Sequence, residues 1–273
     1  MSHGLRYAAN CSLLFTEETL LARPAAAKAE GFDAIEFWWP WPDQPVPRDR
    51  DIDAFVASVT EAGVSLIGLN FFAGDLAGPD CGVLSAPDRA SEFRDNIDVT
   101  IGIGRALGVP AFNALYGNRL EGVDPAEQDE IGTANLVAAA QAAASIGGTV
   151  LVEPVSGPKP YPLRTAADVI TVLDRAEAAG AAGVGFLCDL FHLANNGDDV
   201  LQAITTFGSR IAHVQIADVP GRGQPGTGSL DIDGCLERLS AGGYDGFVAL
   251  EYNPTGSTHD SLGWLPRGRR ATP

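Results

Sequence analysis

Basic residues are scarce in this 273-residue sequence. It carries 18 Lys and Arg against 35 Asp and Glu, which gives a formal net charge of −17. Proteins that bind nucleic acid gain much of their affinity from Lys and Arg that neutralise phosphates, so this balance argues against a nucleic-acid partner. The only basic run is Arg267, Arg269 and Arg270, and we interpret residues 265–273 as a flexible basic tail.

Long apolar runs and paired cysteines are missing as well. The sequence has no apolar run long enough to cross a bilayer, and its N-terminus has no basic segment followed by an apolar one. It therefore predicts neither a membrane span nor a secretory signal. The four cysteines are widely spaced and form no CxxC pair: Cys11, Cys81, Cys188 and Cys235. This usage is typical of reduced, buried thiols in a cytoplasmic protein, not of a zinc site or a disulfide framework.

Short apolar segments alternate with longer helical segments along the whole chain. The predicted strands are Leu5–Asn10, Ala34–Trp38, Ser65–Phe71, Ala111–Tyr116, Thr149–Glu153, Gly183–Asp189, Ala212–Ala217 and Gly246–Tyr252. The predicted helices are Glu17–Glu30, Asp51–Ala62, Ala90–Leu107, Pro125–Ile146, Thr165–Ala179, Asp198–Phe207 and Ile232–Ala241. Asp124 before Pro125, and Thr165 three residues before Asp168, are typical N-terminal helix signals.

This alternation predicts a parallel sheet with a helix after each strand. Eight such units in about 250 residues match a (β/α)₈ TIM barrel and leave no room for a second domain. We therefore expect α/β architecture in a single TIM-barrel domain over 1–273. An open, doubly wound sheet is the alternative, and the number of units favours the barrel.

Polar residues stand at the ends of four consecutive predicted strands. They are Glu153, Asp189, Gln215 and Glu251. Catalytic groups of such barrels lie at the carboxyl ends of the strands, and buried carboxylates close to one another cost several kcal/mol unless a cation compensates them. Three carboxylates and an amide are an all-oxygen ligand set, which suits Mg²⁺ or Mn²⁺ better than Zn²⁺. A metal-free polar cluster is the alternative.

A glycine-rich segment follows the seventh predicted strand. Residues 221–226 match G-x-G-x-x-G formally, but Pro225 interrupts the pattern, no helix opens directly from it, and no strand-end acid follows at the required distance. The match is therefore false. Arg222 is the residue of interest in this segment, because it places a cation near the mouth of the predicted site, although an ordinary exposed arginine remains the alternative.

Other candidates carry weaker signals. His192, just past Asp189, is expected either to reach the substrate or to pack, whereas His213 lies deeper on its strand and is expected to be a paired core residue. Glu36 ends the second strand, ahead of an aromatic and proline-rich segment. Its tryptophans are expected to cap the barrel core, with substrate contact as the alternative: Trp38, Trp39 and Trp41.

Several segments together resemble the hydroxypyruvate isomerase family of xylose-isomerase-like barrels. They are AHVQIADVPGRGQPGTGSLD, LVEPV, CDLFH, LEYNP, LNFFAGD and SEFRDNI, and the resemblance runs from about Leu5 to Trp264. The strand-seven segment is the most specific, because related ketose 3-epimerases usually carry His where this chain has Gln215. Two departures are Gln224 and Ser229, where the family usually has Glu, and the short segment SGPKPYPL after Glu153 also differs from many relatives.

The resemblance implies roles for individual residues. Glu153 and Glu251 would be the acid/base pair. Together with Asp189 and Gln215 they would surround a metal position. His192 and Arg222 would contact the substrate. The implied reaction interconverts hydroxypyruvate and tartronate semialdehyde through an enediolate, with the cation stabilising the developing oxyanion. A carboxylate substrate in a site already near −1 needs a cationic anchor, for which Arg222 is the first candidate and Lys159 the second.

Alternative functions remain open from the sequence. A 2-oxo-tetronate isomerase or a ketose 3-epimerase would use the same acids, whereas a metallonuclease would need more histidines than four and a basic groove. A non-catalytic sugar-acid binding protein would not need both Glu153 and Glu251. The expected partner is a small hydroxy-keto acid, with no nucleic acid and no membrane, and the sequence leaves a homo-oligomer open.

Overall fold

The computed structural model describes residues 3–271 and forms a closed barrel of parallel strands. The strands follow one another around the barrel in chain order: β1 Arg6–Asn10, β2 Ala34–Phe37, β3 Ser65–Asn70, β4 Ala111–Asn113, β5 Thr149–Val152, β6 Val184–Asp189, β7 Ile211–Ile216 and β8 Phe247–Leu250. Pairing of β8 with β1 closes the ring, with Tyr7 opposite Val248. The expected single TIM barrel is confirmed.

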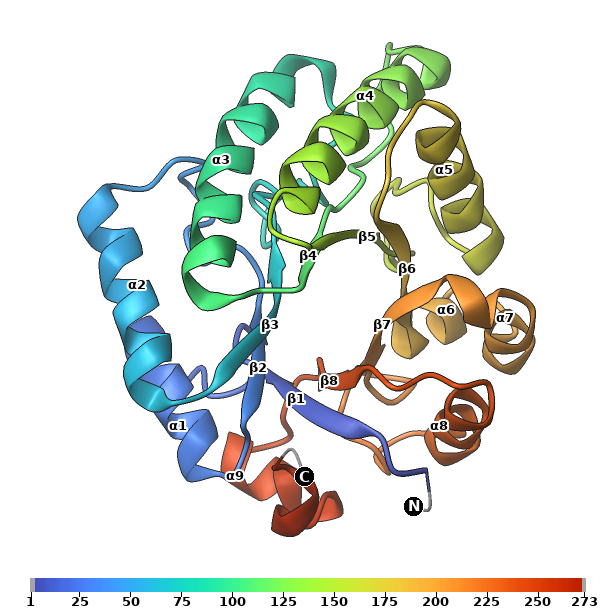
Figure 1. Cartoon of the computed structure of the whole chain (residues 1–273). Helices are drawn as coiled ribbons and strands as arrows, with labels where there is room; N and C mark the ends of the chain where they lie inside the picture. The colour runs from blue at the N-terminus through green and yellow to red at the C-terminus, as the bar shows by residue number, and fades with distance from the viewer. Residues whose placement is uncertain (1–2, 272–273) are drawn as a thin grey trace.

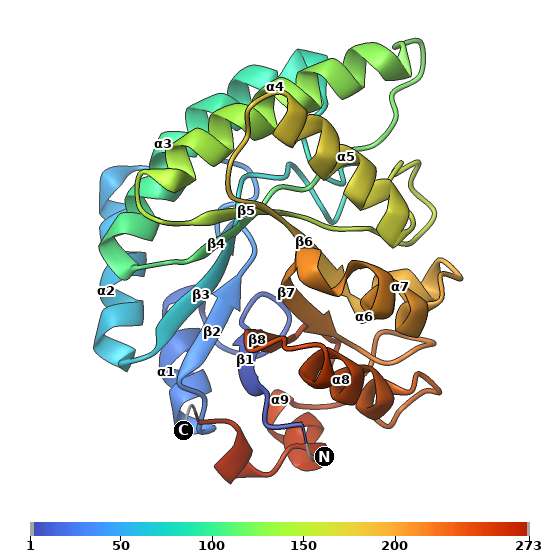
Figure 2. The same ribbon diagram turned by 45° about the vertical axis from the view of Figure 1, so that its right-hand side comes forward.

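Helices form a layer around the outside of the barrel (Figure 1 and, turned by 45°, Figure 2). The seven that correspond to predicted helices are α1 Arg23–Ala29, α2 Asp49–Ala62, α3 Ala90–Leu107, α4 Pro125–Ala144, α5 Ala166–Ala178, α7 Val200–Phe207 and α8 Ile232–Ala241. Two short helices, α6 Leu190–Asn195 and α9 Thr258–Ser261, were not predicted because neither is long enough to show a helical period. Among the described residues, no helix is both long and apolar enough to cross a bilayer.

Helix boundaries follow the side-chain chemistry. The Asp124 carboxylate accepts from the N–H of Ala126 at the start of α4, and Thr165 and Asp168 form a reciprocal capping box at the start of α5, as expected. The first helix begins at Arg23 instead of Glu17. A proline fits only the first turn of a helix, so Pro24 fixes the start there, and the Glu17 carboxylate binds the N–H and hydroxyl of Thr258 instead.

The end of the chain, expected to be a flexible basic tail, is partly buried. Within residues 265–271, Leu265 is fully buried and Arg270 is only 8% exposed, whereas residues 266–268 and 271 are exposed. The Arg270 guanidinium donates to the carbonyl oxygens of Leu262 and Leu265 and to the Glu30 carboxylate at 3.0 Å. A basic run looks solvated in sequence, but Arg270 is buried because it satisfies carbonyl groups that end the chain's last turns. The flexibility of the segment stays a prediction. Residues 272 and 273 lie outside the described residues.

Candidate active site

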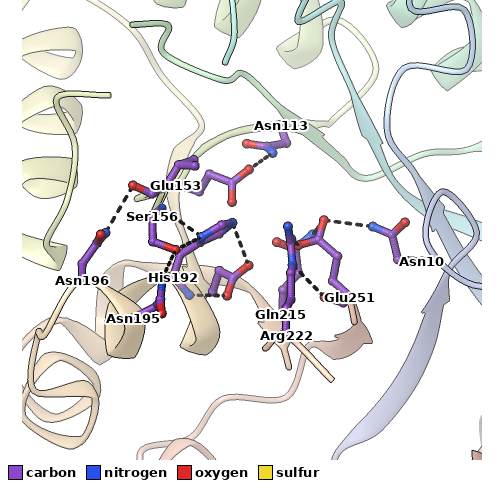
Figure 3. Close-up of polar contacts among 12 residues, drawn as sticks. Asn10, Asn113, Glu153, Ser156, His192, Asn195, Asn196, Gln215, Arg222 and Glu251 are labelled. Atoms are coloured by element: carbon purple, nitrogen blue, oxygen red, sulfur yellow. Dashed lines mark hydrogen bonds and ion pairs between the residues drawn. The ribbon is translucent and has the colours of Figure 1, made fainter. Parts of the chain in front are cut away.

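The polar strand-end residues meet at the carboxyl end of the barrel (Figure 3). Glu153 follows β5, Asp189 ends β6, Gln215 lies in β7 and Glu251 follows β8, and none of the four is more than 5% exposed. Asp189 and Gln215 are direct partners in the β6–β7 ladder. Glu153 and Glu251 both line a cavity of about 310 Å³, together with His192, Arg222 and Lys159. The structure therefore brings all the sequence-predicted site residues to one place.

The carboxyl groups of this site are electrostatically strained. Burial, followed by the negative charges of Glu251 and Asp189, raises the pKa of Glu153 well above its usual value. Burial also raises the pKa of Asp189, although Arg222 opposes the shift. The pKa of Glu251 rises to about 7, again chiefly through burial and again opposed by Arg222. A bound cation would relieve this strain, because it favours the charged forms of all three groups.

One oxygen each of Glu153 and Asp189 and one ring nitrogen of His192 lie within 4.8 Å of one another. The hydrogen bonds of His192 fix what its ring offers. Its Nδ1 accepts from the backbone N–H of Ser156 at 2.9 Å, so a neutral ring carries its proton on Nε2. Burial lowers the pKa of His192 to about 3, which keeps the ring neutral. The ring therefore presents an N–H donor to the site, which suits a substrate oxygen better than a metal ion.

Glu251 is held by several donors at once. Its Oε1 accepts from Trp38 Nε1 at 2.6 Å, from Asn10 Nδ2 at 3.1 Å and from Gln215 Nε2 at 3.3 Å. Its Oε2 pairs with the Arg222 guanidinium at 2.5 Å. These four side chains fix the orientation of the carboxylate.

Glu36, for which the sequence alone predicts no role, organises the opposite end of the same network. Its buried carboxylate accepts from Asn10 Nδ2 at 2.8 Å and from Gln215 Nε2 at 2.8 Å, and it pairs with His213 Nε2 at 2.7 Å. His213 is thus the paired core residue that was expected. Gly68 makes room for this carboxylate, because a Cβ there would stand 3.2 Å from Glu36 Oε2.

The residues fit a hard cation. Because the Gln215 amide nitrogen faces Glu36 and Glu251, its Oε1 is buried and has no hydrogen-bond partner among the described residues. A buried acceptor without a partner is costly, and a metal ion would satisfy it. Asn113 donates to Glu153 Oε1 at 2.6 Å and leaves the other carboxylate oxygen available. Carboxylate and amide oxygens together are the ligands that Mg²⁺ and Mn²⁺ prefer.

Asp218 shapes the glycine-rich loop that carries Arg222. Its carboxylate accepts four backbone N–H groups, at 2.8–3.0 Å, from Val219, Gly226, Gly228 and Leu230. Gly228 is required there, since a Cβ would lie 2.2 Å from the Val219 carbonyl oxygen. The loop is also tied to the segment after β8, because the Arg222 carbonyl accepts from Asn253 N–H at 2.7 Å. Arg222 is therefore a positioned residue, and its guanidinium also lies 5.3 Å from the Phe191 ring centre.

Lys159 lines the cavity, but its ammonium group is hydrogen-bonded mainly to backbone carbonyl groups. Its ammonium group donates to the carbonyl oxygens of Leu76 at 3.0 Å and Asp80 at 2.5 Å. These bonds tie the loop after β5 to the loop after β3 across the mouth of the barrel. Lys159 thus has one donor left for a ligand, whereas the Arg222 guanidinium keeps several.

The tryptophans after β2 divide between two roles. Trp39 and Trp41 pack edge to face with ring centres 5.2 Å apart, and Trp41 packs on Phe55, so these two cap the core as expected. Trp38 instead turns to the site and binds Glu251. Sequence alternation could have separated Trp38 from Trp39, but it gives no partner for either.

Sequence comparison with known proteins identifies the family of this chain. The model of the xylose isomerase-like TIM barrel family matches residues 24–268. A protein of Streptomyces coelicolor, provisionally assigned as a hydroxypyruvate isomerase, is 53% identical over 97% of each chain. The chain belongs to the hydroxypyruvate isomerase family. This family membership confirms that it is an enzyme of the isomerase class, as the sequence analysis expected.

More distant family members carry two names. Hydroxypyruvate isomerase of Escherichia coli is 29% identical over 96% of this chain and 98% of its own. The 2-oxo-tetronate isomerase of Pectobacterium atrosepticum is 30% identical over 95% of this chain and 96% of its own. A solved structure from Brucella melitensis, titled as an AP endonuclease of family 2, is 31% identical, with a TM-score of 0.86 over 96% of this chain and 98% of that one.

Proposed function

We propose that this isomerase interconverts hydroxypyruvate and tartronate semialdehyde. The observation that supports it is a pair of buried carboxyl groups, Glu153 and Glu251, on two sides of one cavity (Figure 3). Burial raises the pKa of both, and that of Glu251 rises to about 7, so the Glu251 carboxyl group can gain or lose a proton at neutral pH. A general acid or base works best when its pKa lies near the working pH.

The two compounds differ by a shift of the carbonyl group between C2 and C3. One carboxylate removes a proton from C3, which gives an enediolate, and the other carboxyl group delivers a proton to C2. The hydroxyl proton on C3 passes to the oxygen on C2, so atoms and charge balance. The neutral His192 ring donates its Nε2–H to a substrate oxygen, which stabilises the negative charge that develops there.

The protein ligands of a divalent cation, Mg²⁺ or Mn²⁺, would be four residues: Glu153, Asp189, Gln215 and Glu251. When bound, the cation supplies electrostatic stabilisation of the negative charge on the substrate oxygens. The unpartnered Gln215 Oε1 and the raised pKa values of the carboxyl groups support this assignment. The chain's own contribution is to hold these oxygens in place through Asn113 and Glu36.

Arg222 would bind the carboxylate of the substrate. Its guanidinium lines the cavity, and a carboxylate matches its paired N–H donors. Lys159, with one donor left, is the second candidate. A positively charged arginine in the cavity favours a small hydroxy-keto acid, which carries a carboxylate, over a neutral sugar. The net charge of −17 supports the absence of a nucleic-acid partner.

A 2-oxo-tetronate isomerase is the second candidate function, which the similarity to the Pectobacterium atrosepticum enzyme favours. The same acids and the same arginine would serve a four-carbon acid. A cytoplasmic location is part of the proposal, because all four cysteines are free thiols, as expected, and suit a reducing compartment.

The deciding experiment is proton NMR of hydroxypyruvate incubated with the protein in D₂O, with Mn²⁺ and with a chelator. We expect deuterium at C3 and C2 and the appearance of tartronate semialdehyde, and a loss of both with the chelator. The Glu251→Gln variant should fall about a hundredfold or more in rate, the usual worth of acid–base catalysis, with its fold intact. No exchange by the wild type, or wild-type rates in the variant, would refute the assignment.

A further inference from the structure

Trp38 is fixed at both its backbone and its ring. Its backbone N–H donates to Ser12 Oγ at 2.9 Å, and its indole N–H donates to Glu251 Oε1 at 2.6 Å. The Arg222 guanidinium, which binds the other oxygen of the same carboxylate, lies 5.9 Å from the Trp38 ring centre. Trp38 and Arg222 thus hold Glu251 from its two oxygens.

Trp38 also lines two neighbouring cavities. The first is the catalytic cavity, with Glu153 and Glu251 in its wall. The second has a similar volume, about 320 Å³, and its lining includes Arg23, Asp43 and Trp39. The residues that line both are Trp38, Leu76 and Ala77. Leu76 is itself held by Lys159, whose ammonium binds its carbonyl oxygen. These three residues form the partition between the two cavities.

We propose that Trp38 determines substrate length and positions Glu251. This inference rests on the proposed function. The ring closes the catalytic cavity on the side of the second one, so an acid with a longer carbon chain meets an aromatic wall. The indole N–H fixes the Glu251 carboxylate where it exchanges a proton with the substrate. With the wall removed, the second cavity becomes a subsite for the hydroxylated end of a longer acid, with Arg23 and Asp43 as its polar lining.

Two variants of Trp38 separate these roles. Trp38→Phe keeps an aromatic wall and loses the indole N–H, whereas Trp38→Ala loses both. We expect kcat for the three-carbon acid to fall about tenfold or more in Trp38→Phe, the worth of a hydrogen bond to a charged group, with little change in KM. Trp41→Phe is the matched control, because Trp41 belongs to the same segment but lines neither cavity, and it should leave both constants unchanged.

The comparison between the two variants isolates the wall. Both lack the N–H, so only the ring distinguishes them. We compare kcat/KM for a four-carbon acid, 2-oxo-tetronate, with kcat/KM for hydroxypyruvate. The ratio of the first to the second should be about tenfold or more higher in Trp38→Ala than in Trp38→Phe, because the alanine variant no longer excludes the longer acid. An equal ratio in the two variants would overturn the role in substrate length. An unchanged kcat in Trp38→Phe would overturn the role in positioning Glu251.

Ligand binding tests the wall without any turnover. Glycerate and threonate are hydroxy acids of three and four carbons that lack the reactive carbonyl group, and calorimetry gives their affinities directly. We expect the affinity for threonate relative to glycerate to rise about tenfold in Trp38→Ala over Trp38→Phe. A flat ratio refutes the wall even if the enzyme isomerises hydroxypyruvate. A rise in the ratio supports the wall even if it does not, so failure of this inference and failure of the proposed function are distinguishable.

Discussion

The stability of the metal-free protein should depend on pH through the buried carboxyl groups, and Glu153→Gln tests this. A carboxyl group whose pKa is higher in the folded than in the unfolded protein binds protons more tightly when folded. Its contribution to stability is therefore complete below the unfolded pKa and is lost as the pH rises through the folded pKa. For Glu251 this window runs from about 4.5 to about 7, and Glu153, whose pKa burial also raises, contributes in the same direction.

The size of the effect follows from these shifts. A rise of the Glu251 pKa from 4.5 to about 7 corresponds to about 3 kcal/mol of stability lost at high pH. Glu153→Gln removes one of the repelling charges and keeps an oxygen that accepts from Asn113. The variant should gain about 1–3 kcal/mol over the wild type at pH 8, or roughly 2–8 °C in Tm, and gain nothing at pH 5.

Thermal unfolding with a chelator, at both pH values, measures the difference between variant and wild type. Addition of Mn²⁺ should reverse the order at pH 8, because the wild type gains binding energy that the variant has lost. Glu121→Gln, at an exposed loop position, is the control and should change stability by less than about 0.5 kcal/mol. An equal effect of Glu153→Gln at the two pH values, or a larger gain from Mn²⁺ in the variant, would refute the reasoning.

Three further variants test neighbouring contacts. Arg222→Met should raise KM for hydroxypyruvate about ten- to a hundredfold and change KM for an uncharged analogue such as glyceraldehyde far less, whereas kcat should fall for both because Glu251 loses its ion pair; equal rises in KM for both would mean that Arg222 does not bind the carboxylate. Glu36→Gln should weaken Mn²⁺ affinity in calorimetry about tenfold, because the amide keeps only one of the two acceptor oxygens that Asn10, Gln215 and His213 share, which loosens the Gln215 amide; unchanged affinity would contradict this. Gln215→Leu should weaken Mn²⁺ binding too, and should also cost about 1–3 kcal/mol in denaturant unfolding, since Glu36 and Glu251 lose a donor; wild-type values in both measurements would make Gln215 a passive core residue.

The fold could be predicted because each level of the sequence agrees. The apolar period, the caps such as Thr165 with Asp168, and the count of strand–helix units all favour the same barrel. The early start predicted for α1 failed because Glu17 binds Thr258, which is 241 positions away, and no local pattern contains that contact. The buried Arg270 was missed for the same reason, since its partners are Glu30, directly after α1, and carbonyl groups in the final turns of the chain.

The site was predictable at its strand ends and not beyond them. Barrel geometry places Glu153 and Glu251 at one end because every parallel strand ends there. The partners of these acids come from other strands, and only the closed barrel brings Asn10 and Glu36 beside Gln215. The pairing of Arg222 with Glu251 could not be predicted either. The loop conformation that directs the guanidinium depends on hydrogen bonds from backbone N–H groups to Asp218, and no sequence pattern indicates these.

That carboxylate gives the loop over 218–230 a property that its glycines would not suggest. A segment without helix or strand normally exchanges its amide protons with solvent quickly, because each opening involves only local contacts. Here the amides of Val219, Gly226, Gly228 and Leu230 share one acceptor, so they should be released together, in one cooperative opening. We therefore expect Arg222, which lies on this loop, to leave the site only when these four hydrogen bonds open together.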